Sequence, residues 1–167
     1  PLVARGSYTP RGKGLVTPAF SFGAQVAHVS VDKETGLVRV KKMWTAHDCG
    51  TVINPSSVEG QLEGSIHMGL GYALCEQFVM DKGKTLTNTF LDYKIPSALD
   101  MPPGESACIE TYEPEGPMGA KEAGEGLASP TAPAIAEAVY HATGYRCMDL
   151  PITPEKILKG MKKKAPK

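Results

Sequence analysis

Four glycines inside one predicted helix constrain this fold more than any other feature of the chain. Asn54-Pro55 predicts the start of the helix, because Asn is a favourable N-cap and Pro suits the first helical position. A helix from about residue 55 to residue 74 is predicted by apolar residues that recur every fourth position, at Val58, Leu62, Ile66, Leu70 and Leu74. The glycines interrupt it at Gly60, Gly64, Gly69 and Gly71. Because four interior glycines cost roughly 4 kcal/mol relative to alanine, we expect a closely packed neighbour, either another backbone or a large ligand.

The remaining elements are predicted to alternate between hairpins and helices, which favours an α+β fold with a mixed sheet packed against two main helices. A strand pair is expected over residues 20–30 and 37–47, with its turn at residues 32–36, and a second hairpin over residues 75–90. A further strand is expected over residues 106–112. Ser129-Pro130 predicts a helix to about Thr143 with Gly144 as its stop, and Thr153-Pro154 predicts a short helix to about Lys159. We expect an extended segment over residues 1–18, one domain over 19–160 and a basic tail over 161–167.

The composition narrows the class of protein. Lys plus Arg and Asp plus Glu both number 18, so the net charge is zero, which argues against a large basic surface for nucleic acid or anionic membrane. The four cysteines show no metal-ligand spacing, so we expect free thiols, a cytoplasmic location and no protein-ligated metal. No run approaches the roughly 18 apolar residues of a membrane span. The chain begins with Pro1 and no Met, as expected of a processed chain, a split subunit or an excised fragment.

The segment Gly116-Pro-Met-Gly-Ala-Lys-Glu-Ala-Gly-Glu-Gly126 is the most unusual in composition. Its glycines allow close approach of the backbone to a ligand and leave N–H groups available, and the following helix adds a partial positive charge. Glu125, between two glycines, is the best candidate for a catalytic carboxylate. The alternative interpretation is a surface loop with solvated charges.

Two further segments carry polar groups. Gln61, in the glycine helix, could offer both a donor and an acceptor to a polar cofactor, or it could be a solvated residue on a helix-packing face. His47-Asp48-Cys49 invites a metal or nucleophile interpretation. Consecutive strand residues point to opposite faces, however, so we interpret this segment as the end of a strand.

Six segments, in order, are similar to the molybdopterin-binding subunit of the xanthine oxidase family. The segments are residues 48–55, 59–71, 92–96, 116–126, 130–136 and 149–158, and the similarity as a whole covers roughly residues 18–160. The resemblance implies a molybdenum–molybdopterin cofactor, which could carry a cytosine dinucleotide, and it implies no protein ligand to the metal. It also implies that Glu125 is the general base. The side chain of Gln61 and the backbone groups of Lys121, Glu122, Ala123 and Gly124 are then expected to lie against the pterin or its nucleotide.

The same resemblance implies a larger assembly. The family's subunit is several times longer than this chain, so we expect the chain alone neither to hold the cofactor nor to turn over. The expected partners are the remainder of the molybdenum subunit, iron–sulfur and FAD subunits, and a small aromatic or aldehyde substrate. Within the family, Ala-Lys-Glu-Ala-Gly-Glu-Gly looks most like bacterial enzymes, and a 4-hydroxybenzoyl-CoA reductase-like protein is our specific expectation. The alternative is a non-catalytic binding or assembly module with an anion-receptive glycine loop.

Overall fold

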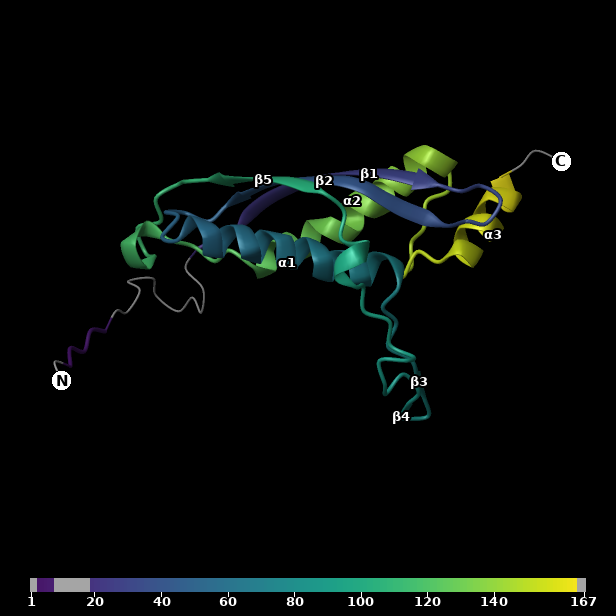
Figure 1. Ribbon diagram of the computed structural model, residues 1–167, viewed down its shortest axis with the longest axis horizontal. Helices are drawn as coiled ribbons and strands as arrows, with labels where there is room; N and C mark the ends of the chain where they lie inside the picture. Colours follow the sequence, from purple (N-terminus) through teal and green to yellow (C-terminus); the bar gives the residue numbers. More distant parts are fainter. Residues whose placement is uncertain (1–2, 8–18, 165–167) are drawn as a thin grey trace.

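The computed structural model describes residues 3–7 and 19–164 and has two layers, a three-stranded sheet and a pair of long helices. Figure 1 shows the sheet along one side of the molecule with α1 beneath it, α2 rising diagonally from beneath the strands to the level of β1, and α3 beside the strand ends. The predicted α+β class and the pairing of a mixed sheet with two main helices are confirmed. Of the predicted N-terminal segment, residues 3–7 form no helix or strand, and residues 1–2 and 8–18 lie outside the described residues.

The sheet has the order β1-β2-β5. β1 (Phe22–Val31) and β2 (Val38–Asp48) form the predicted antiparallel hairpin, whereas β5 (Gly104–Ile109) pairs parallel to β2. The register shifts between His28 and Val29, which leaves Lys41 as an extra residue in β2. This bulge lets Val40 and Met43 face the same core although three positions separate them. The predicted strand over residues 106–112 begins and ends earlier than expected, because its pairing with β2 fixes its limits.

The first long helix, α1 (Pro55–Leu74), has the limits that the sequence predicts. The side chain of Asn54 accepts a hydrogen bond from the Ser57 amide at 3.1 Å, which is the expected N-cap. Gly69 meets the expected close neighbour, since a Cβ there would lie 2.7 Å from Thr131 Oγ1 on α2. A Cβ at Gly60 or Gly64 would meet nothing within 4 Å among the described residues, so those two glycines face open space.

The second long helix, α2 (Glu125–Thr143), begins five residues before the predicted first residue Pro130, so the expectation for Ser129-Pro130 is wrong. Pro130 and Pro133 lie inside the helix, while Gly124 is its N-cap. The earlier start is stabilised by burial of Leu127, which is fully buried, and by a carboxylate that caps the first amides, as described below. The predicted stop is confirmed, because Gly144 has a φ of 72° and donates its amide to Tyr140 O at 2.7 Å.

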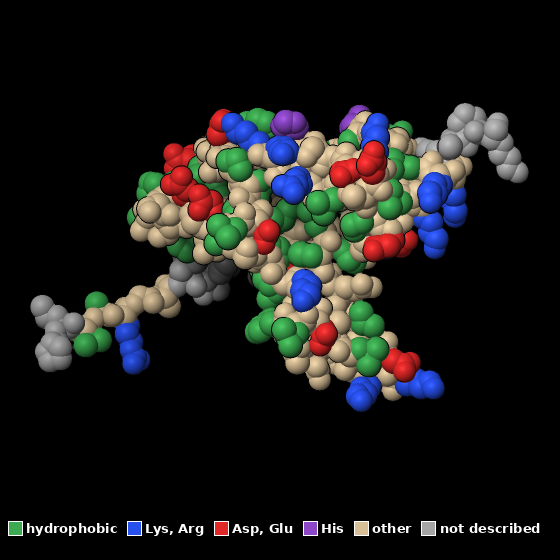
Figure 2. Space-filling model, turned by 45° about the vertical axis from the view of Figure 1, so that its right-hand side comes forward, with side chains coloured by type: hydrophobic (Ala, Val, Ile, Leu, Met, Phe, Trp, Pro, Cys, Tyr) green, Lys and Arg blue, Asp and Glu red, His purple; other side chains and the backbone are tan. Residues whose placement is uncertain are grey.

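An arm projects from the end of α1 and carries the predicted second hairpin (Figures 1 and 2). The two strands of the hairpin are short, with β3 (Met80–Asp81) paired to β4 (Lys84–Thr85). The chain then forms the 3₁₀ helix η1 (Ala98–Asp100) before β5 and a second 3₁₀ helix, η2 (Pro117–Gly119), after it. Its exposed hydrophobic side chains are Phe78, Met80, Leu86, Phe90 and Leu91. Hydrophobic side chains are visible along it in Figure 2.

The last helix, α3 (Pro154–Lys164), runs past the predicted end near Lys159 and takes in residues 161–164 of the predicted tail; residues 165–167 lie outside the described part. Ile152 and Ile157 join one core with Met43, Ile66 and Val139. Burial of such aliphatic side chains is the main stabilising contribution to a two-layer fold of this size. Within the described residues, no helix has the length and apolar character needed to cross a membrane.

Candidate functional site

The glycine-rich loop is fixed to the end of β2 by backbone hydrogen bonds. Lys121 N donates to Cys49 O at 2.8 Å, and Thr51 N donates to Gly119 O at 2.8 Å, so residues 50 and 120 form an antiparallel bridge. Gly50 has a φ of +64°, and a Cβ there would lie 2.9 Å from Lys121 N and closer still to Gly119 O. A residue with a side chain therefore does not fit at this crossing.

A buried ion pair between two side chains also holds the loop to the end of β2. Lys121 Nζ donates to Asp48 Oδ2 at 2.7 Å, and the two side chains are 7% and 9% exposed. Burial acts to raise the pKa of Asp48, but hydrogen bonds from Lys121, from the Thr111 hydroxyl and from the Gly50 amide outweigh it and hold the pKa well below its usual range. The Lys121 ammonium thus bonds to Asp48 and, at 3.1 Å, to the Thr111 hydroxyl.

The carboxylate of Glu122 lies against the start of α2. It accepts hydrogen bonds from Gly124 N at 2.8 Å, from Gly126 N at 3.1 Å and from the Ser21 hydroxyl. Burial acts to raise the pKa of Glu122, but these three hydrogen bonds lower it below its usual value. The fully buried ring of His47 places Nε2 3.0 Å from Glu122 O, so Nε2 is the donor of that bond. Glu122 therefore contributes its side chain to the loop itself, and the predicted contact of its backbone with the cofactor stays a prediction.

Helix α1 meets the loop directly. Ser65 Oγ lies 2.6 Å from Gly124 O and 2.7 Å from Gln61 O, and its single proton is donated to one of them at a time. A Cβ on Gly124 would lie 3.1 Å from Gln61 Oε1, so the amide side chain of Gln61 sits over this glycine. Two of the predicted site residues, from segments far apart in the sequence, are therefore neighbours.

A cavity of about 220 Å³ opens beside this contact. Three predicted site residues line it, namely Gln61, Lys121 and Ala123, together with Cys49, Thr51, Ile53, Asn54, Ser57, Val58 and Ala120. Among the described residues, the backbone amides of Glu122 and Ala123 have no hydrogen-bond partner. Free amides, an amide side chain and small residues suit a polar, planar ligand that approaches the backbone closely, as a pterin does. The donor set fits the predicted cofactor on this side.

Glu125 is the first residue of α2 and is exposed. It follows Gly124 directly, one residue beyond the contact with Gln61, but it does not line the 220 Å³ cavity. The structure thus places the predicted catalytic residue on the first turn of a helix and not in the middle of a loop. Within residues 3–7 and 19–164, no three His, Cys, Asp or Glu side chains converge as a metal site.

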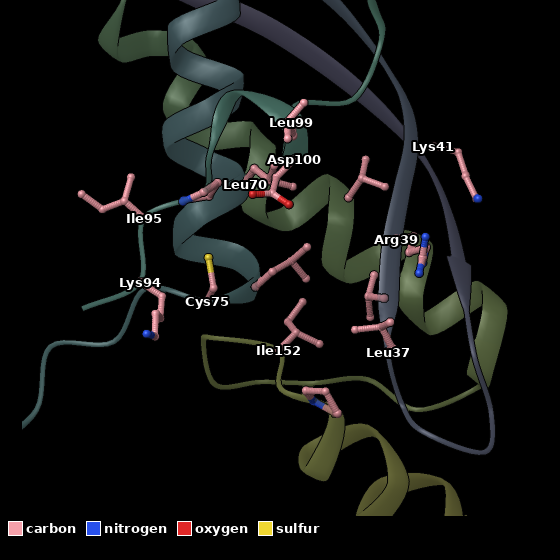
Figure 3. Close-up of a pocket in the computed structure, with 15 residues that line it drawn as sticks. Leu37, Arg39, Lys41, Leu70, Cys75, Lys94, Ile95, Leu99, Asp100 and Ile152 are labelled. Carbon is pink, nitrogen blue, oxygen red and sulfur yellow. The ribbon is translucent and has the colours of Figure 1, made fainter. Parts of the chain in front are cut away.

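A larger cavity, about 690 Å³, lies at the opposite end of α1 (Figure 3). It is bounded by β2, by the C-terminal end of α1 and by two further segments, one around Leu99 and one around Ile152. None of the predicted site residues lines it. We assign the site to the smaller cavity, because Gln61, Lys121 and Ala123 line it.

Sequence reasoning missed the side chains that shape the loop. Asp48 was taken as the end of a strand, which it is, but its ion pair with Lys121 joins residues 73 positions apart. Ser65 and Thr111 were not singled out at all. No local pattern announces such contacts, since they depend on how β2, β5 and α1 are brought together.

Comparison with known proteins agrees with this geometry. Residues 1–102 match the family described as the molybdopterin cofactor-binding domain. The chain is 37% identical over 139 residues to the xanthine dehydrogenase molybdenum-binding subunit of Escherichia coli O157:H7, covering 82% of this chain and 18% of that protein. It is 41% identical over 150 residues to the nicotine 6-hydroxylase large subunit of Paenarthrobacter nicotinovorans, covering 87% and 18%.

A solved structure shares the fold. Quinoline 2-oxidoreductase from Pseudomonas putida 86 superposes with a TM-score of 0.78 at 35% identity, over 84% of this chain and 18% of that one. The chain thus spans less than a fifth of the length of the relatives that it matches. It belongs to the molybdopterin cofactor-binding domain family, and the region it represents is part of the molybdenum-binding subunits of the xanthine oxidase family.

Proposed function

We propose that this chain forms one wall of the molybdopterin site in a larger oxidoreductase, with Glu125 as the general base. In this proposal the N-terminal half of α1 and residues 121–124 face the cofactor. The observation that carries the proposal is the packing of Gln61 and Ser65 against Gly124, which places the polar face of α1 beside the residue that precedes Glu125.

The chain's own groups divide the work. When bound, the molybdenum–pterin group supplies the redox chemistry, which no side chain of this chain provides. Gln61 and the amides of Glu122 and Ala123 position it through hydrogen bonds, and Ala123 keeps the surface shallow enough for close approach. Glu125 takes up the proton released as the substrate reacts, a role that requires a carboxylate within hydrogen-bond reach of that proton.

The finer features of the enzyme belong to the same proposal. The pterin could carry a cytosine dinucleotide, and iron–sulfur and FAD subunits would pass the electrons onward. The relatives reported above are named for xanthine, nicotine and quinoline, which supports an aromatic heterocycle as substrate, and an aldehyde stays the alternative. A 4-hydroxybenzoyl-CoA reductase-like activity stays a specific prediction, which a substrate panel with heterocycles, aldehydes and the thioester would test.

The test uses the complete enzyme with Glu125→Gln. The amide keeps the shape of the side chain but cannot act as a base. We expect molybdenum content to stay at the wild-type level while turnover falls by roughly 10²–10⁴-fold, the range of general-base catalysis. Wild-type turnover in this variant would remove Glu125 from the mechanism and favour a binding or assembly role for the chain.

A further inference from the structure

The carboxylate of Glu122 bonds to the two residues that flank Glu125. Gly124 N donates to Glu122 Oε2 at 2.8 Å and Gly126 N donates to Glu122 Oε1 at 3.1 Å, so one carboxylate spans the backbone before and after residue 125. A glycine N-cap has no side chain that could accept hydrogen bonds from the first amides of a helix, and Gly124 is the N-cap of α2. Glu122 supplies the missing acceptor from outside the helix, and its negative charge suits a helix N-terminus.

Other groups hold this carboxylate in turn. The Ser21 hydroxyl donates to Oε1, and His47 Nε2 lies 3.8 Å from the same oxygen while it bonds to Glu122 O at 3.0 Å. Because the His47 ring is fully buried, it fixes the backbone of residue 122. Gly126 also packs closely against this cluster, since a Cβ there would lie 3.0 Å from Ser21 Cβ and closer still to Glu122 Oε1.

We propose that Glu122 is a positioning residue for Glu125, and that its side chain does not bind the cofactor. This inference rests on the proposed function, because it gives Glu122 its effect through the base. Fixing both neighbouring amides leaves the backbone of Glu125 a single position, so that only its side-chain rotamers remain free. A displacement of about 1 Å in a catalytic group can lower the rate about 10²-fold.

The primary experiment compares Glu122→Gln, Glu125→Gln and the double variant in the complete enzyme. Glutamine has a single acceptor oxygen, so one of the two glycine amides loses its partner. For Glu122→Gln we expect kcat to fall about 10–100-fold, with KM and molybdenum content unchanged. We expect the double variant to be no slower than Glu125→Gln, because residues that act as a unit are not additive. Glu34→Gln, in the exposed β1–β2 turn, is the matched control and should keep the wild-type rate.

Hydrogen exchange of the same enzymes gives a readout that does not depend on turnover. At least one of the amides of Gly124 and Gly126 should exchange faster in Glu122→Gln than in wild type, while peptides from the C-terminal half of α2 should not change. If Glu122→Gln fails to fold, Ser21→Ala replaces it, since that variant removes only one bond to the carboxylate. We then expect a smaller fall in kcat, together with faster exchange at both glycines.

Three results would overturn the inference: loss of molybdenum from Glu122→Gln, which indicates a cofactor contact; wild-type kcat in Glu122→Gln, or in Ser21→Ala where that replaces it; or a further loss in the double variant equal to that of the single one. Failure of the proposed function is recognised separately, because it would appear as wild-type turnover in the single variant Glu125→Gln.

Discussion

The Lys121 ammonium lies 2.7 Å from Asp48 Oδ2, and together these side chains join the end of β2 to the glycine-rich loop. Breaking a buried pair by removing one charge leaves the other without compensation, at a cost of about 3–5 kcal/mol. We therefore expect Asp48→Asn to lower the free energy of unfolding strongly, as measured by urea denaturation of the 167-residue chain. The double variant Asp48→Asn/Lys121→Met should recover much of that loss, and a double variant as unstable as Asp48→Asn would argue that the pair is not the cause.

The same pair predicts a dependence of stability on pH. The folded-state pKa of Asp48 lies below its unfolded value of about 3.9. The stability that its ionised form contributes is therefore complete above that pH and is lost as the pH falls below it toward the folded-state pKa. Wild-type chain should lose stability more steeply than Asp48→Asn between about pH 4 and pH 2. Parallel curves for the two proteins over this range would contradict the assignment.

The bridge between β2 and the loop predicts an unusually severe glycine substitution. Gly50→Ala forces an L-residue to a φ of +64° and also places its Cβ against the backbone of residues 119 and 121. Gly83→Ala is the matched control, because Gly83 has a φ of +82° with nothing within 4 Å of a Cβ among the described residues. The control should cost about 1–2 kcal/mol for the backbone conformation alone, and Gly50→Ala clearly more. Equal losses in thermal denaturation would mean that the backbone contact does not constrain this position.

Two glycines of α1 should respond in opposite directions. Gly69→Ala places a Cβ against Thr131, and overpacking of this kind costs about 1–3 kcal/mol. Gly64→Ala meets nothing within 4 Å among the described residues and should stabilise the isolated chain by about 1 kcal/mol through helix propensity. Melting temperatures of the two variants measure both effects. A destabilised Gly64→Ala chain would show that a neighbour not seen here already contacts that face.

Local signals predicted the parts of the fold that local interactions determine. The limits of α1 follow from the Asn54 cap and the spacing of apolar residues, and the β1–β2 hairpin follows from alternation around the turn at Gly36. The predicted start of α2 was wrong because Ser129-Pro130 resembles a helix start, whereas the side chain of Glu122 caps the helix further upstream. The parallel pairing of β5 with β2 depends on tertiary packing, and no sequence period indicates it.

The site was predicted mainly through resemblance. Pattern alone left Gln61 open as a solvated helix residue and Glu125 open as a loop charge, because isolated Gly, Gln and Glu are common on surfaces. The structure adds what the sequence cannot state, namely that Gln61 lies over Gly124 and that the amides of Glu122 and Ala123 have no partner among the described residues. The glycine spacing of α1 correctly required a close neighbour at Gly69 but could not distinguish it from Gly60, which faces open space.

Cofactor loading of Ala123→Phe in the complete enzyme tests most directly whether α1 and the loop form a wall of the pterin site. A phenyl ring at residue 123 would occupy the cavity of about 220 Å³ beside Gln61. Ala98→Phe, in the exposed η1 at the other end of α1, is the control. We predict that Ala123→Phe folds and assembles but binds less than about a tenth of the wild-type molybdenum and pterin, as expected when a side chain fills space that a ligand needs. Ala98→Phe should load fully. Full loading of Ala123→Phe would contradict the account.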